Sequence, residues 1–417
     1  MASVPDLLQR IRELVSAIKV HKDAIRELER TKSEVEGDLN AILDPVTRLP
    51  LEISSEIFLR CLPSNPTCDI HDAPLIFMRV CHSWSNIALS TPSLWTSVSF
   101  QSPCRKGALK LCDDWFNRSK TLPRSLSVSG SLDETAAGLV GRHADRLQNL
   151  NLALSSGQEL CPLLKMQFAS LTSLTIVVPR PQRNLAEHSS TVDECAQLLC
   201  AAPNLVKCVW DGLIFPRDIS RNHEYPTSYT HPSLKSLLLG PDDQDPSGTG
   251  CILRFMTLPA LETLSIPFLL IAPSDFISFL TRSSAPLRTL SMKVDRFGPM
   301  WSIEAMDAFF RVLPTLTHLS LQLGRGNQFF GFLVLRSLRE LPNLRDLQIR
   351  ECAPLARVQY EELVSALAAR TEMRSFRFAW SDSFAGHTPD PDILILLQEI
   401  AENGMEMHVG LEGSNLI

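Results

Sequence analysis

Three patterns of apolar and polar residues follow one another along the chain. Residues 4–43 repeat with a helical period, residues 49–98 contain short helical stripes, and from about residue 120 onward a Leu-x-x-Leu-x-Leu pattern recurs. Apolar residues spaced by three or four predict amphipathic helices, whereas short alternating runs between turn residues predict strands. We therefore expect a long helix, a small helical module and a repeated array of strands and helices, which is an α/β chain.

The long helix over residues 4–43 can be written as heptads. Its a positions are Val4, Ile11, Ile18, Ile25, Lys32 and Leu39, and its d positions are Leu7, Leu14, His21, Leu28, Val35 and Ile42. Ten of these twelve residues are apolar, and Ile at a with Leu at d favours a parallel two-stranded coiled coil. Lys32 and His21 weaken this seam, and Asp44-Pro45 ends the helix.

Two interpretations of this helix are open. The first is a coiled coil that makes the chain a homodimer through residues 4–43. The second is a single amphipathic helix that folds back on its own domain. Leu8 and Val15 widen the apolar stripe in the first two heptads, which suits the second interpretation.

The next apolar stripes predict a small helical module. Pro50 stands where a helix tolerates proline, and Ile53, Ile57, Phe58 and Leu62 form one stripe after it. A second short helix is expected from the spacing of Phe77, Val80, Cys81, Trp84, Ile87 and Ala88. Thr91-Pro92 stops it, and Leu94 and Trp95 follow as a further apolar anchor. Helices this small cannot bury so much apolar surface among themselves, so a partner or the following domain must cover the rest.

Three motifs in this module occur together: Leu49-Pro50-Leu51-Glu52-Ile53, Val80-Cys81-His82-Ser83-Trp84 and Thr91-Pro92-Ser93-Leu94-Trp95. Their combination resembles an F-box. The resemblance implies a module that docks on a Skp-type adaptor and attaches a substrate receptor to a cullin-RING ubiquitin ligase. The adaptor-binding residues it implies are Leu49, Pro50, Ile53, Ile57, Phe58, Val80, Cys81, Trp84, Ile87 and Trp95. The segment 63–74 is longer than the family pattern, and we expect it to loop out.

The repeats after residue 120 carry the remaining pattern. Complete copies begin at Leu147, Leu171, Leu205, Leu234, Leu261, Leu287, Leu316, Leu344 and Met373, and Leu126/Val128 is a partial first copy. Their spacing lies in or near the leucine-rich-repeat period, and helical patterns fill the intervals, as at 192–201, 274–282, 302–312, 328–340 and 359–369. The array resembles leucine-rich repeats, although many copies lack the Asn or Cys that follows the last Leu. The resemblance implies a solenoid with a curved parallel sheet, closed by a helix at 391–403 and a last strand near 408–410.

In such a solenoid the residues between the leucines face one side of the sheet. In the last repeats this face carries Lys293, His318, Gln322, Asp346, Gln348, Arg350 and Arg377. Our hypothesis is that these residues bind a protein substrate with an acidic element. The alternative is a solvated sheet face with scattered charges.

Composition narrows the choice of function. A net charge of −6 argues against nucleic-acid binding, and no apolar stretch reaches the length of a membrane span. No signal peptide is recognisable at the N-terminus. The eleven cysteines contain no Cys-x-x-Cys pair and read as free thiols of a cytoplasmic or nuclear protein. Cys68, His71, Cys81 and His82 do not fit a common zinc module, so we expect no metal or cofactor.

Motifs of enzymes are missing from the sequence: it has no phosphate-binding glycine loop, no Gly-x-Ser-x-Gly and no His-Glu-x-x-His. We therefore expect a chain without catalytic residues, with a helix at 1–44, an F-box-like domain at 45–98 and a leucine-rich-repeat-like region at 99–417. The predicted function is that of the substrate-recognition adaptor of an SCF-type ubiquitin ligase. The alternative is a coiled-coil and repeat scaffold that works independently of ubiquitin.

Overall fold

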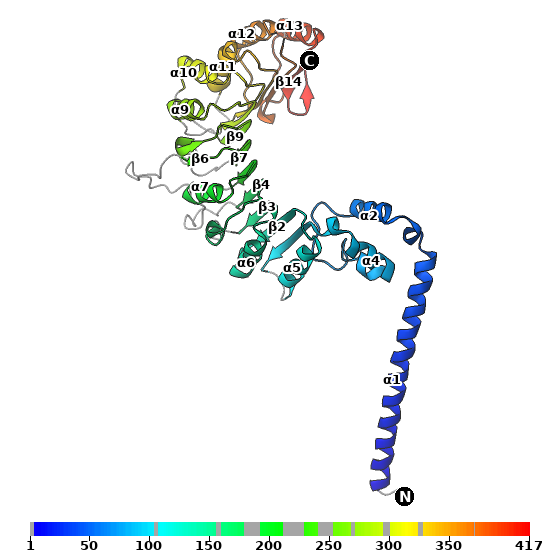
Figure 1. Ribbon diagram of the computed structural model, residues 1–417. Coiled ribbons are helices and arrows are strands. Elements are labelled where there is room, and N and C mark those ends of the chain that lie inside the picture. The colour runs from blue at the N-terminus through cyan, green and yellow to red at the C-terminus, as the bar shows by residue number, and fades with distance from the viewer. Residues whose placement is uncertain are drawn as a thin grey trace. The chain divides into compact units, whose positions relative to one another are not determined.

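The chain is a mixed α/β protein with a long N-terminal helix and a large, mostly parallel sheet (Figure 1). A computed structural model describes residues 4–103, 107–155, 160–178, 192–211, 229–240, 253–267, 272–294, 301–323, 328–370 and 372–417. Two compact units are distinguished: Met1–Ser99 with Lys110–Leu122, and Phe100–Leu109 with Pro123–Ile417.

The first unit is helical. It contains α1 (Val4–Leu43), the 3-10 turn η1 (Pro45–Arg48), α2 (Leu51–Arg60), α3 (Phe77–Val80), α4 (His82–Ser90), η2 (Pro92–Trp95) and most of α5 (Ala108–Arg118). The helix predicted at 4–43 is confirmed. It ends where Asp44 turns to extended backbone and its carboxylate accepts the Val46 N–H at 2.8 Å, which caps η1.

The prediction of one helix through Phe77 and Ala88 is wrong at Cys81. This residue has an extended backbone (φ −158°, ψ 170°) and separates α3 from α4. Its Sγ atom accepts the backbone N–H of Trp84 at 3.5 Å, so Cys81 is the N-cap of α4. A helical spacing of apolar residues is preserved across the break, which is why the pattern alone did not reveal it.

Aromatic side chains form the interior of the first unit. Phe58 stacks on Phe77 with ring centroids 4.2 Å apart and lies 5.0 Å from Trp84. The rings of Trp95 and Trp115 meet edge to face at 5.2 Å, and the Trp95 indole N–H donates to the carbonyl of Ala88 at 2.9 Å. Trp115 belongs to α5, which the sequence patterns did not predict.

The segment 63–74 packs partly against this interior. Pro66, Ala73 and Pro74 are buried, and the carbonyl of Pro66 accepts the Ser99 N–H at 2.6 Å. Cys68 lies with its Sγ atom 3.4 Å from that of Cys112 on α5. The expectation that the whole segment loops out is therefore wrong at Pro66 and at 73–74, while residues 63–65 and 69–72 are exposed.

The second unit is built on a 13-stranded sheet that begins at β1, with strand order β1-β2-β3-β4-β5-β7-β9-β10-β11-β12-β13-β14-β15. The strands are β1 (Ser97–Ser102), β2 (Arg124–Gly130), β3 (Leu147–Leu154), β4 (Ser173–Val177), β5 (Lys207–Asp211), β7 (Ser236–Leu239), β9 (Thr263–Pro267), β10 (Thr289–Val294), β11 (His318–Leu323), β12 (Asp346–Cys352), β13 (Ser375–Trp380), β14 (Glu406–Leu411) and β15 (Ser414–Asn415). Each of the nine complete Leu-x-x-Leu-x-Leu copies, and the partial first copy, forms one of these strands. Two further short strands, β6 (Tyr229–Thr230) and β8 (Met256–Thr257), pair with each other.

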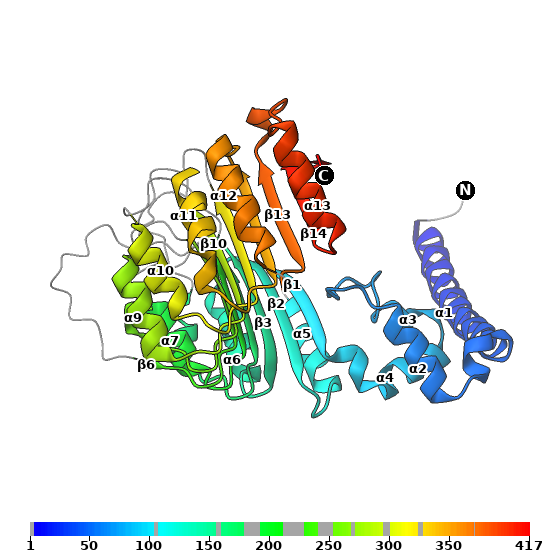
Figure 2. The ribbon, with the colours of Figure 1, turned by 90° about the horizontal axis from the view of Figure 1, so that it is seen from above.

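Helices cover one face of this sheet (Figure 2). They are α6 (Glu134–His143), α7 (Val192–Ala201), α9 (Pro273–Ser283), α10 (Ile303–Arg311), α11 (Gln328–Ser337), α12 (Arg357–Ala368) and α13 (Pro391–Glu402), with 3-10 turns at η4 (Leu163–Lys165), η6 (Leu338–Glu340) and η7 (Asp382–Phe384). Consecutive helices from α9 to α13 pack on one another. Ser302 caps α10 by accepting the Ala305 N–H at 3.2 Å, so α10 begins where the sequence pattern placed it. The starts of α9 and α12 lie one and two residues before the predicted ones.

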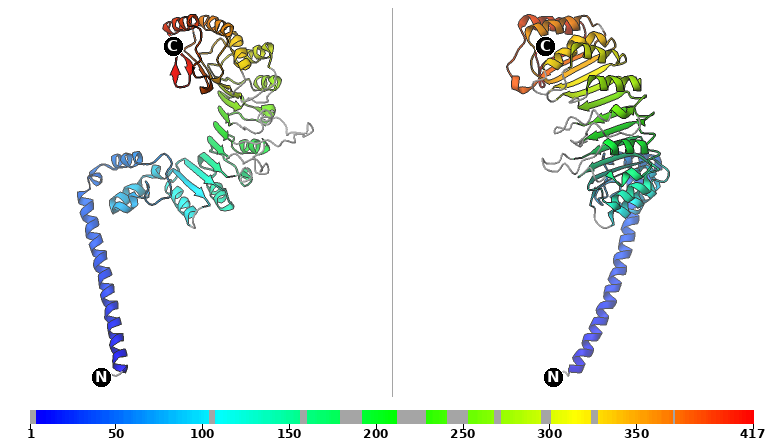
Figure 3. Two further views of the ribbon diagram at one scale, coloured as in Figure 1. Left: turned by 180° about the vertical axis from the view of Figure 1, so that it is seen from behind. Right: turned by 90° about the vertical axis from the view of Figure 1, so that its left-hand side faces the viewer.

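From β2 to β14 the neighbouring strands of the sheet run parallel (Figure 3), and their residues pair in register. The leucines of the repeats therefore align across the sheet, as Leu290, Leu319, Leu347 and Phe376 do, and all four are at most 1% exposed. Each such side chain contributes roughly 1.5–3 kcal/mol through removal from water. The core of the unit lies between this face and the helices, where Phe276 of α9 stacks on Phe309 of α10 at 5.0 Å.

The sheet ends in a hairpin of β14 and the antiparallel β15. The strand predicted near 408–410 is β14, whereas β15 was not predicted. Asn415 on β15 accepts the Val409 N–H and donates to the carbonyl of Met407, both at 2.9 Å. Gly410 is required where β14 approaches β15, because a Cβ atom at this position would lie 2.2 Å from the carbonyl oxygen of Ser414.

Candidate functional site

Two surfaces gather the residues that the sequence singled out, one in each unit. In the first unit, α2 has a buried inner face and an exposed outer face, and the residues of the outer face directly precede those of the inner face in the sequence. Ser54 and Phe58 point inward and are 1% exposed, whereas Ile53 and Ile57 are 51% and 38% exposed. Residues four apart share a helix face, so Ile53 and Ile57 lie together. The single stripe predicted through Ile53, Ile57, Phe58 and Leu62 is wrong, because Phe58 lies on the inner face.

Polar bonds hold α2 in this orientation. The Ser54 hydroxyl donates to the carbonyl of Val46 at 2.9 Å, and the hydroxyls of Ser55 and Thr91 lie 2.8 Å apart. These contacts tie the inner side of α2 to η1 and to the start of η2. The isoleucines are thereby left facing solvent.

Six exposed apolar residues of the first unit lie on α2, on α3 or directly before them: Leu49, Leu51, Ile53, Ile57, Ile76 and Val80, which are between 38% and 51% exposed and which we call the exposed apolar set. Ile70, Leu89 and Leu122 are exposed elsewhere in the unit, as are the apolar residues of α1. Pro50, the N-cap residue of α2, is exposed as well. Leu49, Pro50, Ile53, Ile57 and Val80 were among the predicted adaptor-binding residues, while Leu51 and Ile76 were not. Isolated apolar residues on a surface are ordinary, but several on one small module are typical of an interaction surface.

Other predicted adaptor-binding residues lie elsewhere. Phe58 and Trp95 are 1% and 0% exposed, so they belong to the interior and support the exposed set from within. This corrects their prediction as contact residues. Cys81, Trp84 and Ile87 are partly buried. The Trp84 indole N–H donates to the Asp44 carboxylate, which joins α4 to the end of α1.

In the second unit, the predicted substrate-binding residues are brought together by the strand register. One row across the strands contains Thr289, His318, Asp346, Ser375 and Glu406; a second contains Ser291, Ser320, Gln348, Arg377 and His408; a third contains Lys293, Gln322, Arg350, Ala379 and Gly410. We refer to these as the polar rows. Neighbours within a row are about 4.8 Å apart, the usual spacing of paired strands.

The first polar row contains an ion-pairing contact. The Nε2 atom of His318 lies 2.9 Å from an Asp346 carboxylate oxygen, and its Nδ1 atom lies 2.8 Å from the hydroxyl of Thr317. His318 is about half exposed in its side chain. The imidazole is thus held upright on the sheet face while one edge remains accessible.

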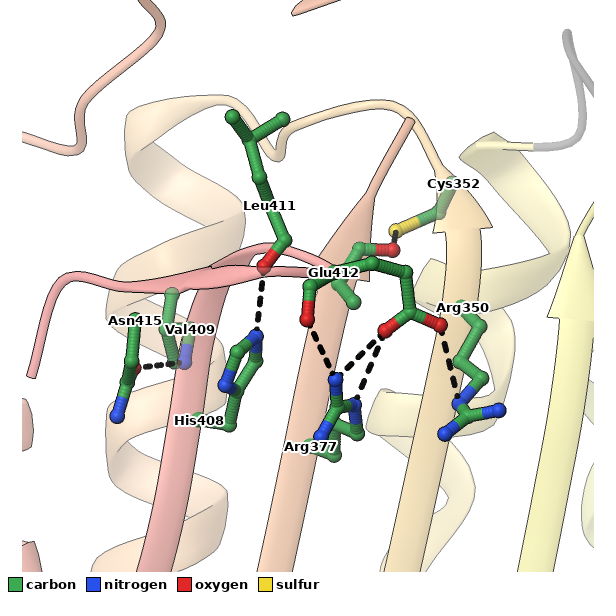
Figure 4. Close-up of polar contacts among 9 residues, drawn as sticks. Arg350, Cys352, Arg377, His408, Val409, Leu411, Glu412 and Asn415 are labelled. Carbon is green, nitrogen blue, oxygen red and sulfur yellow. Dashed lines mark hydrogen bonds and ion pairs between the residues drawn. The ribbon is translucent and has the colours of Figure 1, made fainter. Parts of the chain in front are cut away.

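The two arginines predicted to bind an acidic partner already share a carboxylate of their own chain (Figure 4). Glu412, in the turn between β14 and β15, receives Arg377 Nη2 at 2.7 Å and Arg377 Nε at 3.2 Å. Arg350 Nε lies 3.3 Å from the other oxygen of the same carboxylate. Glu412 could not be identified from the sequence, because no pattern links a turn residue to strands some 35 and 60 positions earlier. The hypothesis that this face binds a substrate with an acidic element stays a prediction.

Metal-binding clusters of three or more His, Cys, Asp or Glu are not found among the described residues. None of the described helices combines the length and apolar content needed to cross a membrane. No protein-family model matches the chain, and no curated protein matches it. The two surfaces therefore have to be interpreted from their own chemistry.

Proposed function

We propose that this chain is the substrate-recognition adaptor of an SCF-type cullin-RING ubiquitin ligase. Its first unit would act as the F-box, binding a Skp-type adaptor, and its second unit would bind a protein substrate. The chain would perform no chemistry, since the ligase supplies the reacting groups and the adaptor holds the substrate near them.

The observation that carries this proposal is the exposed apolar set on a module whose interior is formed by other side chains. Phe58, Phe77 and Trp95 are buried in the interior of the first unit, whereas Ile53 and Ile57 remain exposed on the other face of α2. Covering an aliphatic side chain at an interface contributes roughly 25 cal/mol per Å² of apolar surface. The Leu49-Pro50 start of α2 and the Val80-Cys81 corner, which carry the F-box resemblance, contribute Leu49 and Val80 to this exposed set.

We further propose that the second unit is a leucine-rich-repeat solenoid. The regular spacing of the strands, their parallel register and the helix after most of them support this reading. The polar rows are the surface we propose for the substrate, because side chains there stand on a rigid sheet. The described cysteines are free, which suits the cytoplasm or nucleus in which such a ligase would act.

Capture of the adaptor tests the first part of this proposal. The full chain is co-expressed with a Skp-type adaptor and purified through a tag on the adaptor. Recovery of the wild type and a loss of at least tenfold in Ile53→Glu and in Leu49→Ala/Pro50→Ala support the proposal. Val358→Glu is the matched control, since Val358 is also an exposed aliphatic residue of a helix, at 66%, but lies on α12.

The outcome against the proposal is equally concrete. A folded wild-type chain that the adaptor does not capture, or capture unchanged by Ile53→Glu, would leave the ubiquitin-independent scaffold as the better account. Circular dichroism of each variant separates lost binding from lost folding.

A further inference from the structure

The helix α1 exposes nearly all of its apolar seam. The nine described apolar residues at a and d positions are between 52% and 71% exposed: Val4, Leu7, Ile11, Leu14, Ile18, Ile25, Leu28, Val35 and Leu39. Ile42 and Leu8 lie outside the described side chains. A helix of 40 residues is about 60 Å long, and an apolar stripe of that length is far larger than a monomer normally exposes.

This exposure bears on the two interpretations of α1. A helix that folded back on its own domain would bury one face, yet every described side chain from Val4 to Glu36 is exposed. Helices in water draw most of their stability from packing of the apolar face. The apolar a and d residues of α1 can therefore be buried only against a partner with a second apolar stripe of equal length.

The charges of α1 are distributed unequally between its halves. Residues 4–23 contain four basic and three acidic residues, a net charge of +1, whereas residues 24–43 contain three basic and five acidic residues, a net charge of −2. A second copy laid antiparallel places each half against the half of opposite charge. A parallel pair would place like on like, which is unfavourable at close range.

The two polar residues of the seam favour the same orientation. In a parallel pair in register, Lys32 faces Lys32 of the second copy and His21 faces His21. In the fully overlapping antiparallel pair, Lys32 faces Leu14, and His21 faces Ile25, while Ile11 faces Val35. The ammonium group of Lys32 then extends past an apolar neighbour to solvent, without a like charge opposite.

We propose that α1 binds α1 of a second copy of this chain as an antiparallel two-stranded coiled coil. Intrahelical ion pairs such as Arg30 with Glu27 at 2.5 Å and with Glu34 at 2.8 Å lie off the seam. They keep the outer face solvated while the a and d residues interdigitate. The dimer would carry two copies of each surface described above, and it does not depend on what those surfaces bind.

Light scattering coupled to size-exclusion chromatography tests the dimer on the full chain. The wild type is expected at twice the mass of one chain, and Ile18→Glu/Leu28→Glu at the mass of one chain. Val20→Glu is the matched control, because Val20 is 64% exposed on the same helix but stands at a c position away from the seam. Glutamate is a good helix former, so a loss of helical signal in the double variant that Val20→Glu does not show reflects the lost partner helix and not the glutamate itself.

Cross-linking tests the orientation. A chain carrying Ile11→Cys is mixed with a chain carrying Val35→Cys, oxidised and digested, and linked peptides are identified by mass spectrometry. A link between positions 11 and 35 is expected. A monomeric wild type, a dimer that survives Ile18→Glu/Leu28→Glu, or links of 11 to 11 and 35 to 35 would overturn the proposal.

Discussion

Arg377 and Glu412 are joined by two hydrogen bonds, from Nε at 3.2 Å and from Nη2 at 2.7 Å to the same carboxylate oxygen. Arg377 Nη2 also donates to the backbone carbonyl of Glu412 at 2.9 Å. β13, the neighbour of the terminal hairpin in the sheet, is thereby fastened to the turn between β14 and β15. The carboxylate of Glu412 supplies the counter-charge of both Arg377 and Arg350.

Removing the charge of Glu412 should expose this cationic pair. In Glu412→Gln, Arg350 and Arg377 lose their internal counter-charge, so we expect a glutamate-rich peptide to bind several-fold more tightly than it binds the wild type. Fluorescence anisotropy of a labelled peptide measures this. The cost to stability should stay below about 1 kcal/mol, since partly exposed ion pairs contribute little. Glu402→Gln changes the net charge equally on α13, and an equal gain there would show that the effect is not local.

Serine should replace Cys81 as the N-cap residue of α4, whereas alanine should not. Because its Sγ atom accepts the Trp84 N–H, Cys81→Ser preserves an acceptor in the same place, whereas Cys81→Ala leaves that N–H unpaired. We expect the serine variant to be about 1 kcal/mol more stable than the alanine variant in urea unfolding. Equal stability of the two variants would mean that the sulfur does not cap α4.

Phe58 and its neighbour Ile57 should respond differently to truncation. Phe58 is buried against Phe77 and Trp84, so Phe58→Ala should destabilise the first unit by about 3–5 kcal/mol. Ile57 is 38% exposed, so Ile57→Ala should leave the thermal midpoint nearly unchanged while weakening adaptor capture. An Ile57→Ala protein that unfolds as early as Phe58→Ala would contradict the inner and outer faces assigned to α2.

His231 should make the second unit sensitive to mild acid. Burial lowers the pKa of this imidazole, and the contact of its Nε2 atom with the carbonyl of Ala202 at 3.0 Å opposes that effect. The unfolded chain takes up a proton near pH 6.5, while the folded chain stays neutral to lower pH. The contribution of neutral His231 to the free energy of unfolding is therefore fully present above about pH 6.5. It is lost as the pH falls from there toward the lower pKa of the folded state, by at most about 1.4 kcal/mol per pH unit.

The variant His231→Gln retains an N–H donor for Ala202 but does not titrate. Denaturant unfolding at pH 7.5 and pH 5.5 should show a smaller loss of stability for this variant than for the wild type. His82→Gln, at the exposed start of α4, is the control for exchanging a histidine for glutamine elsewhere in the chain. Equal slopes for the wild type and His231→Gln would count against the assignment.

Much of the fold could be predicted because apolar spacing records which face of an element is buried. The long helix at 4–43 and the strands around residues such as Leu290 and Leu319 repeat a local rule many times, so single irregularities do not obscure it. The break at Cys81 could not be predicted in the same way. One extended residue between two helices leaves the three- and four-residue spacing nearly intact, and a thiol is an unusual cap.

The sequence predicted which strands and helices carry the candidate surfaces, but it did not predict which side chains are buried or which partners they contact. Strand register brings His318 beside Asp346 as the repeat pattern implies. The burial of Phe58 and Trp95 and the pairing of Glu412 with Arg350 depend on contacts between residues far apart in the chain. A local pattern states that a residue is apolar or charged, but the partner that it meets is decided by tertiary packing.

The side-chain amide of Asn415 forms the hydrogen bonds that a backbone peptide group of a neighbouring strand would form. Its amide oxygen and nitrogen satisfy Val409 and Met407 on the outer side of β14, where a further strand would otherwise bond. An unpaired strand edge is a template for aggregation and for unwanted strand exchange between chains. With one side chain taking the part of a missing strand, fewer backbone groups of β14 are left at this edge for a strand of another chain to bind.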